Sequence, residues 1–297
     1  MITLTNSKNS QKKLFSGLKT VLYDICSKPS GAIGFSLVLF HVILALVSPA
    51  IVPYDYKAMD AASMLSTPSV DHWLGTDHLG RDVLTRVLLG GREAIFVTAV
   101  ATPIAVMWGG FIGIFFGLIG GRVDEFFMRI VDAFLSLPWI LKMLVLIVTF
   151  GSSMFVLMPT LAFFYGIPVI RIARAATHDV VARDFILSAK ARGQKRITII
   201  MRELLPNVLD TLMVEGAMRW SWMLLAFSSL SFLGFGVSPP TPDWGLMISD
   251  ARGFMSFRPW GVIGPVIALS TLIIGINLTA DALAKALGVD RAQKAPV

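Results

Sequence analysis

Residues 95–119 read IFVTAVATPIAVMWGGFIGIFFGLI, a strongly apolar stretch that contains no charged residue. A helix of about 20 residues is long enough to cross the hydrocarbon core of a bilayer. Inside a membrane the backbone must satisfy its own hydrogen bonds, and the apolar runs lack the two-residue alternation of barrel strands. The sequence therefore predicts an all-α polytopic membrane protein with six transmembrane helices, at 31–51, 95–119, 131–150, 154–170, 212–235 and 262–280.

Charge is scarce in this chain and unevenly placed. The 297 residues are 55% hydrophobic and 15% charged, with a mean hydropathy of +0.72, whereas a soluble domain carries about 25% charged residues. Lys and Arg outnumber Asp and Glu in residues 1–30 and 171–207, and the second of these segments has eight basic residues and three acidic ones. Residues 52–94, in contrast, have four basic and six acidic residues. Since basic loops stay in the cytoplasm, we expect both termini and 171–207 inside. The net charge of +7 then reflects topology and predicts no nucleic-acid partner.

The expected organisation is one membrane domain with an N-terminal helical addition. A cleaved signal peptide is the less favoured interpretation of the first span, because its charged region would be about thirty residues long and Ser48-Pro49-Ala50 is a poor cleavage site. The single cysteine, Cys26, excludes an internal disulfide. The predicted parts are a cytoplasmic tail (1–30), the first span with a periplasmic loop (31–93), a five-helix core (94–283) and a cytoplasmic tail (284–297).

Both outer loops carry signals of ordered structure. In the first, Thr76 or Asp77 can cap a short helix that ends at Gly90-Gly91. The second, 236–260, is rich in proline, and its Trp244 and Trp260 are candidate interfacial anchors. The short helix is predicted to be amphipathic and to lie at the outer membrane surface, with Val83, Leu84, Val87 and Leu88 on one side and Arg81, Asp82 and Arg86 on the other.

Two histidines in the first outer loop raise the question of a metal site. His72 and His78 lie near Asp77 and Asp82 in the sequence. Their spacing fits neither helical pairing nor a known ligand pattern. Helix capping and loop structure explain these side chains better, and we expect no metal here.

The segment 171–207 is helix-prone and ends in an amphipathic run. Gly193 permits a left-handed turn, so we expect two short helices, at 188–192 and 196–204. Pro206 marks where the next span can begin. By composition alone the segment is an ordinary basic loop, and a stiff helix that docks on a cytoplasmic partner is the other interpretation. The predicted apolar face consists of Ile197, Ile199, Ile200 and Leu204, with Arg196 and Arg202 solvated.

Three charged residues fall within predicted spans. Glu215 and Arg219 are four residues apart and so share one face of their helix, and Lys142 lies mid-span in the third helix. Charges at membrane depth usually face a cavity or pair with each other. Arg219, partly neutralised by Glu215, could line a translocation path and meet an anionic group, or the pair could be structural. For Lys142 the structural interpretation is favoured, since its long stem can reach the interface.

Four motifs occur in order along the chain. They are Leu74-Gly-Thr-Asp-His-Leu-Gly-Arg-Asp82, Arg129-Ile-Val-Asp132 with Pro138, Gly193 followed by Pro206, and Leu230-Ser-Phe-Leu-Gly-Phe-Gly-Val-Ser-Pro-Pro240 before Trp244-Gly245. Together they resemble the C-type permease subunits of the dipeptide, oligopeptide and nickel group of ATP-binding-cassette importers, over nearly the whole chain. The chain departs from the group at Leu187, where the coupling motif has Glu, at Glu203, where it has Ile, and at Phe227, which aligns with a frequent Glu.

The resemblance implies a type I importer permease fold in the bacterial inner membrane, carrying peptides or a related small solute. It implies a heterodimer with a homologous permease, two cytoplasmic ATP-binding subunits and a periplasmic or lipid-anchored substrate-binding protein. ATP is then used by the partners, and this chain binds no cofactor and is no enzyme. The residues implied to couple to the ATPases are Ser188, Ala189, Lys190, Ala191, Arg192, Gly193, Ile197, Ile200, Leu204 and Pro206.

Other function classes find less support in the sequence. His-Glu-x-x-His and Gly-x-Ser-x-Gly are absent, and without a Gly-Lys dipeptide the chain lacks the phosphate-binding Walker loop. A self-contained secondary transporter is the remaining alternative. It would be expected to show inverted repeats, and none is visible, although Pro159 and Pro168 interrupt the fourth span.

Overall fold

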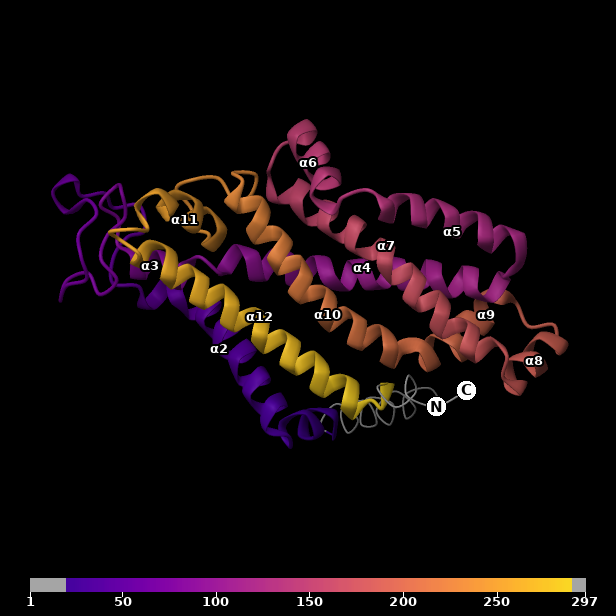
Figure 1. Ribbon diagram of the computed structural model, residues 1–297. Coiled ribbons are helices and arrows are strands. Elements are labelled where there is room, and N and C mark those ends of the chain that lie inside the picture. The colour runs from indigo at the N-terminus through magenta and orange to yellow at the C-terminus, as the bar shows by residue number, and fades with distance from the viewer. Residues whose placement is uncertain (1–19, 290–297) are drawn as a thin grey trace, which may run out of the picture.

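The computed structural model describes residues 20–289, which form helices and connecting loops (Figure 1). Of the predicted tails, 1–19 and 290–297 lie outside the described residues, and 20–26 is helical. The long helices are α2 (Pro29–Ile51), α4 (Arg92–Ile119), α5 (Gly121–Ser136), α6 (Trp139–Phe150), α7 (Met154–Val181), α10 (Leu205–Phe232) and α12 (Trp260–Ala286). The short elements are α3 (Val83–Leu89), α8 (Asp184–Ala191), α9 (Arg196–Ile199), α11 (Trp244–Ala251), the 3-10 turns η1 (Ala61–Ser63) and η3 (Arg252–Phe254), and the π-helical turn η2 (Ile200–Leu204).

Four helical stretches are long and apolar enough to cross a membrane: α2, the stretch Val83–Ile119 that contains α4, α7 and α12. The pair α5 and α6 would be a fifth if it counts as one bent span. The helix α10 has a comparable length of 28 residues but is less apolar, since Glu215 and Arg219 lie within it. The prediction of a largely helical membrane protein is confirmed at this level.

The predicted span at 131–150 is not one continuous helix, because this segment belongs to two helices. Helix α5 begins early, at Gly121, and ends at Ser136, while α6 starts at Trp139 and is bent from α5 by 83°. Between them Leu137 and Pro138 have extended backbone conformations. Proline lacks a backbone N–H and disfavours the helical conformation of the preceding residue. The motif proline therefore separates the two helices.

Helices α4 and α7 pack with their backbones in direct contact. A Cβ atom on Gly109 would lie 2.3 Å from the carbonyl oxygen of Gly166, and one on Gly113 would lie 2.4 Å from that of Ile170. Gly117 meets α7 in the same way, one turn further along. Small residues four apart allow such close approach between membrane helices, where packing replaces the hydrophobic effect. The glycine stripe of α4 thus fixes the central helix pair of the protein.

A second close pair joins the first and last long helices. Figure 1 shows α2 (indigo) running beside α12 (yellow). A Cβ atom on Gly34 would lie 2.6 Å from the Cβ of Leu278, and one on Gly275 would lie 2.8 Å from the Cβ of Leu37. Helix α2 is otherwise poorly covered, since only Gly31, Gly34, His41 and Ser48 are buried along it.

The connecting segments gather at the two ends of the molecule. Figure 1 places α3, α11 and the loop at 52–82 at one end, and α8 with α9 at the other. The start of α2 and the end of α12 lie on the side of α8 and α9. The segment that the sequence places outside the membrane in the first loop is therefore opposite the basic segment.

We predict that Gly113→Val destabilises the protein by about 2–3 kcal/mol, because its side chain would overlap the backbone of α7. The midpoint of thermal unfolding in detergent measures this loss. Gly253→Val is the matched control, since no atom lies within 4 Å of its added Cβ, and its effect should stay within about 0.5 kcal/mol. Equal shifts in the two variants would contradict the close packing of α4 on α7.

Candidate functional site

Much of the predicted loop at 171–207 is helical. Helix α7 continues to Val181, so Arg171 and Arg174 belong to it rather than to a loop. The chain then forms α8 and α9 and passes through η2 directly into α10. The predicted fourth span, 154–170, is accordingly too short by eleven residues, since α7 ends at Val181 rather than at Ile170.

Gly193 terminates α8 in the left-handed conformation that the sequence predicts. Its φ is +69°, and its N–H donates to the carbonyl of Lys190 at 2.9 Å. The N–H of Gln194 donates to the carbonyl of Ala189 at 3.2 Å. These two bonds define a Schellman motif, in which a residue with positive φ satisfies the last carbonyls of a helix. A residue with a Cβ atom is strained in this position.

Most of the apolar face predicted after Gly193 points inward, and Ile197 is the one of its four residues that is exposed. Ile199, Ile200 and Leu204 are at most 2% exposed. They join a buried cluster with residues of α4, α7 and α10, such as Ile114 and Val169. Hydrophobic side chains are buried wherever the chain's own helices offer apolar surface. These residues therefore anchor η2 to the bundle.

The outward side of this region has a different composition from the predicted one. Of the residues assigned to coupling, Ala189, Ile200 and Leu204 are buried. The others are exposed, as are Arg196, Arg202 and several large apolar side chains. The exposed set consists of Ser188, Lys190, Ala191, Arg192, Gly193, Ile197 and Pro206, next to exposed Phe185, Leu187 and Met201.

Two arginines of α7 tie this helix to α5. The Arg174 guanidinium holds the buried Asp124 carboxylate through two hydrogen bonds, with Nε at 2.6 Å from Oδ1. Arg171 lies 3.5 Å from Asp132, and both side chains are 59% exposed. The sequence analysis did not single out Asp124. An arginine in an apolar helix signals that an acid faces it, but only the packing of α5 on α7 shows which acid.

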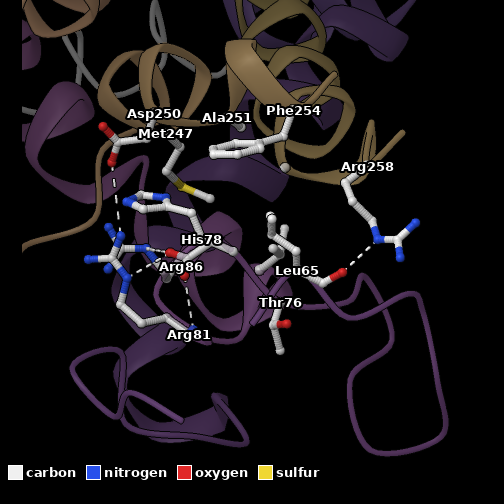
Figure 2. A pocket seen from close by; sticks show the side chains of 13 residues that line it. Leu65, Thr76, His78, Arg81, Arg86, Met247, Asp250, Ala251, Phe254 and Arg258 are labelled. Atoms are coloured by element: carbon white, nitrogen blue, oxygen red, sulfur yellow. Dashed lines mark hydrogen bonds and ion pairs between the residues drawn. The ribbon is translucent and has the colours of Figure 1, made fainter. Parts of the chain in front are cut away.

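A cluster of charged side chains around the buried Arg81 and Arg86 stands at the end of the protein that carries α3 and α11 (Figure 1 and Figure 2). Arg81 donates to Asp77 at 2.6 Å and lies 3.9 Å from Asp250 of α11. Arg86 lies 3.8 Å from Asp77 and donates to the carbonyls of Tyr56 and Pro240 at 3.2 Å. The cluster joins the first outer loop to the segment after α10.

The predicted solvated polar side of α3 is wrong, because Arg81, Asp82 and Arg86 are all buried. Helix α3 is capped by Asp82, whose carboxylate accepts a hydrogen bond from the N–H of Thr85 at 2.7 Å. The predicted caps, Thr76 and Asp77, do not have this role. The second oxygen of Asp82 lies 2.9 Å from Nδ1 of His72, and His78 stacks on Phe254 instead. These side chains are used for capping and loop contacts.

Trp244 is a buried core residue, so its predicted role as an interfacial anchor is wrong. It is 1% exposed, and its indole N–H donates to the carbonyl of Val87 at 2.8 Å. The ring occupies the space beside Gly90 and Gly91, where an added Cβ would lie within 2.8 Å of it. The glycines that end α3 thus make room for the tryptophan of the later motif. Trp260 is partly exposed.

Asp243 begins α11 next to this tryptophan. Its carboxylate accepts from the N–H of Leu246 at 3.2 Å, as an N-cap does. Burial raises the pKa of Asp243 to about 6, although the N–H groups of Leu246 and Gly245 oppose this shift. The region around α3 and α11 therefore contains a carboxyl group whose pKa lies in a mildly acidic range.

The three charged residues predicted within spans lie near one cleft. Lys142 and Arg219 both line it, with aromatic walls from Trp139, Phe164, Tyr165 and Trp222 and a volume of about 480 Å³. Glu215 and Arg219 are hydrogen-bonded on α10, as the structural interpretation expects. Lys142 donates to the carbonyl of Phe134 at 2.7 Å and so caps the end of α5. The break at Pro138 places Lys142 in the first turn of α6 rather than in mid-span.

The sequence of this chain matches a known family over most of its length. Residues 109–290 match the model of the binding-protein-dependent transport system inner membrane component. The chain belongs to this family. The matched residues include α8, α9 and the cleft between α6, α7 and α10. Membership makes the chain an inner-membrane permease subunit of an ATP-binding-cassette importer and decides against the secondary-transporter alternative.

Several curated permeases are similar to this permease along most of their length. The dipeptide transport system permease protein of Alkalihalophilus pseudofirmus is 31% identical over 86% of this chain and 84% of its own. The nickel transport system permease protein of Escherichia coli is 31% identical over 88% of this chain and 94% of its own length. The oligopeptide transport system permease protein of Bacillus subtilis is 27% identical over 95% of this chain and 92% of its own length. The predicted family resemblance is confirmed, and these relatives are permeases rather than enzymes.

We predict that Asp124→Asn destabilises the permease by about 3 kcal/mol, because it leaves the Arg174 guanidinium without its buried partner. Asp132→Asn removes the exposed pair with Arg171 and should cost less than about 1 kcal/mol. Thermal unfolding of both variants in detergent measures the difference. A loss as large for Asp132→Asn would show that burial does not distinguish the two pairs.

We predict that Asp243 makes the stability of the permease depend on pH. Because its folded pKa of about 6 exceeds the unfolded value, its stabilising contribution is complete below pH 3.8 and is lost as the pH rises through 6. Asp243→Asn keeps a capping side chain and should remove this dependence, which amounts to at most about 3 kcal/mol.

The pH dependence of stability is expected to have the opposite sign at Asp60, because hydrogen bonds from Ser63 and Ala62 lower the pKa of its carboxyl group. Its contribution is present above the ordinary pKa and is lost as the pH falls. Thermal unfolding between about pH 2.5 and pH 7, a range that extends below the ordinary pKa of Asp60, compares wild type, Asp243→Asn and Asp60→Asn. A wild-type profile that matches Asp243→Asn throughout would contradict the raised pKa of Asp243.

Proposed function

We propose that this permease forms half of a translocation pathway and pairs with a homologous permease subunit. Its cargo would be a peptide or a related small solute, delivered by a periplasmic or lipid-anchored binding protein. Two cytoplasmic ATP-binding subunits would supply the energy, and this chain would hold no cofactor. The family match supports this assembly, and the names of the dipeptide, nickel and oligopeptide relatives support the cargo class.

The proposed topology has six spans with both termini in the cytoplasm. Support comes from α2, α4, α7 and α12, from the bent pair α5 and α6, and from the length of α10. In Figure 1 the start of α2 and the end of α12 face away from α3 and α11, in the direction of the basic region of α8 and α9, which agrees with the positive-inside rule. The core permease domain would be 94–283, preceded by the first span and periplasmic loop at 31–93.

The observation that carries the coupling role is the two-sided burial of the segment 184–206. Its inner side, with Ile199, Ile200 and Leu204, is anchored among α4, α7 and α10. Its outer side exposes Lys190, Arg192 and other polar and apolar groups. A rigidly anchored element transmits motion without slack. We therefore assign the contact with the ATP-binding subunits to the exposed side alone, and an anchoring role to Ala189, Ile200 and Leu204.

The proposed translocation path follows the cleft between α6, α7 and α10. Lys142 and Arg219 line this cleft, and Glu215 holds Arg219 in place. Charged groups at membrane depth are expensive unless they face a partner or a wet cavity. Their convergence on one cleft supports a functional location better than three separate structural roles.

We predict that Gly193→Asp leaves the permease inserted in the membrane but abolishes transport and weakens association with the ATP-binding subunits. The Schellman turn requires positive φ, and a residue with a Cβ costs about 1–2 kcal/mol there, so the outer side of α8 and α9 is misplaced. Co-purification of the ATPase subunits and transport into proteoliposomes measure the two effects.

Gly234→Asp is the matched control, because Gly234 also has positive φ, open space and the two hydrogen bonds of a Schellman motif, but it ends α10 rather than α8. It should strain the backbone equally and leave the ATPase subunits bound. Normal transport and normal complex yield in Gly193→Asp would overturn the coupling assignment.

A further inference from the structure

The cleft between α6, α7 and α10 contains a positive charge that the protein itself does not balance. Its described lining has two cationic side chains, Lys142 and Arg219, and no carboxylate. The other lining residues are mostly apolar or aromatic. In such surroundings the interaction between opposite charges is stronger than in water. A ligand with a negative group is therefore the natural complement of this cleft.

The two cations differ in how far they are already satisfied. Arg219 donates to Glu215, and both side chains are mostly buried, so this pair is close to neutral as a unit. The ammonium of Lys142 forms no ion pair with any residue in the described range 20–289. Its neighbours are the carbonyl of Phe134 at 2.7 Å and the ring of Phe164 at 5.5 Å.

Lys142 also has hydrogen-bonding capacity left. An ammonium has three N–H donors, and the carbonyl of Phe134 takes one of them. That carbonyl lies in the last turn of α5, so the bond holds the lysine at the break between α5 and α6. The ammonium is thus positioned on the cleft wall with donors to spare, whereas Arg219 is oriented by an acid of its own helix.

We propose that the cleft binds the carboxylate group of a cargo molecule, with Lys142 as its direct contact and Arg219 as a positioning residue. This inference rests on the proposed translocation path and names the chemical class of the cargo: a small solute with a free carboxylate. The aromatic walls of Trp139 and Trp222 accommodate its apolar part. Sequence reasoning considered Arg219 for this role beside a structural one, and the ion-pair geometry points to Lys142 instead.

The test compares two probes of nearly the same shape, the anionic N-acetyl-L-alanine and the neutral N-acetyl-L-alaninamide. They are titrated into the complete detergent-solubilised transporter, and binding is followed by tryptophan fluorescence. Trp139→Phe identifies the signal that arises in the cleft. We expect the acid to bind at least about tenfold more tightly than the amide, as a charge-assisted hydrogen bond predicts.

The variants separate the charge of Lys142 from its bond to Phe134. Lys142→Gln keeps an N–H donor and should lose the preference for the acid, whereas Lys142→Arg should retain it. Lys57→Met replaces an exposed lysine of the outer loop and should leave the preference unchanged. The double variant Glu215→Gln/Arg219→Met removes the pair as a neutral unit and should weaken the binding of both probes by a similar factor.

Three results would overturn the proposal: no saturable binding of the acid, equal binding of acid and amide in the wild type, or a preference that survives Lys142→Gln. A carboxylate from the partner permease that neutralises Lys142 would produce the second result. Co-purification of the ATPase subunits and ATP-driven transport report on the proposed function separately. A complex that assembles and transports without a preference for the acid overturns this inference alone.

Discussion

The contact between the backbones of α4 and α7 is the constraint on which the rest of the structure depends. At Gly109 and Gly113 the two helices approach so closely that any side chain would overlap the opposite backbone, and at Gly117 it would meet the side chain of Thr177. In lipid, helices are held together by such packing and by interhelical polar bonds. Because α7 is fixed along its length, the groups near both of its ends are fixed with it.

One end of α7 extends beyond the predicted span and carries the polar machinery of that side. Its Arg174 binds Asp124 of α5, and its last turn leads into α8. The buried residues of η2, Ile200 and Leu204, pack in one hydrophobic cluster with residues of α4, α7 and α10. The region that meets the ATP-binding subunits in our proposal is therefore attached to the bundle both before and after its exposed side. Nearer the middle of α7, Tyr165 and Pro168 contribute to the wall of the cleft.

Properties that depend on a short stretch of sequence were largely predictable. Four of the apolar runs correspond to helices long and apolar enough to span, and Gly193 adopts positive φ. The break at Pro138 was equally local, but the apolar run that contains it concealed the boundary. The direction of side chains was not predictable. Ile200 turns inward and Trp244 is buried because segments distant in the chain cover them.

By itself, the sequence determined the helical membrane class, the approximate positions of the spans, the basic side and the family, because hydrophobic length, charge and motif order are local properties. Only the tertiary structure decided that Asp124 pairs with Arg174, that Arg81, Asp82 and Arg86 are buried, and that Lys142 shares a cleft with Arg219. These facts depend on which helix faces which, and that is set by close packing between residues far apart in the chain.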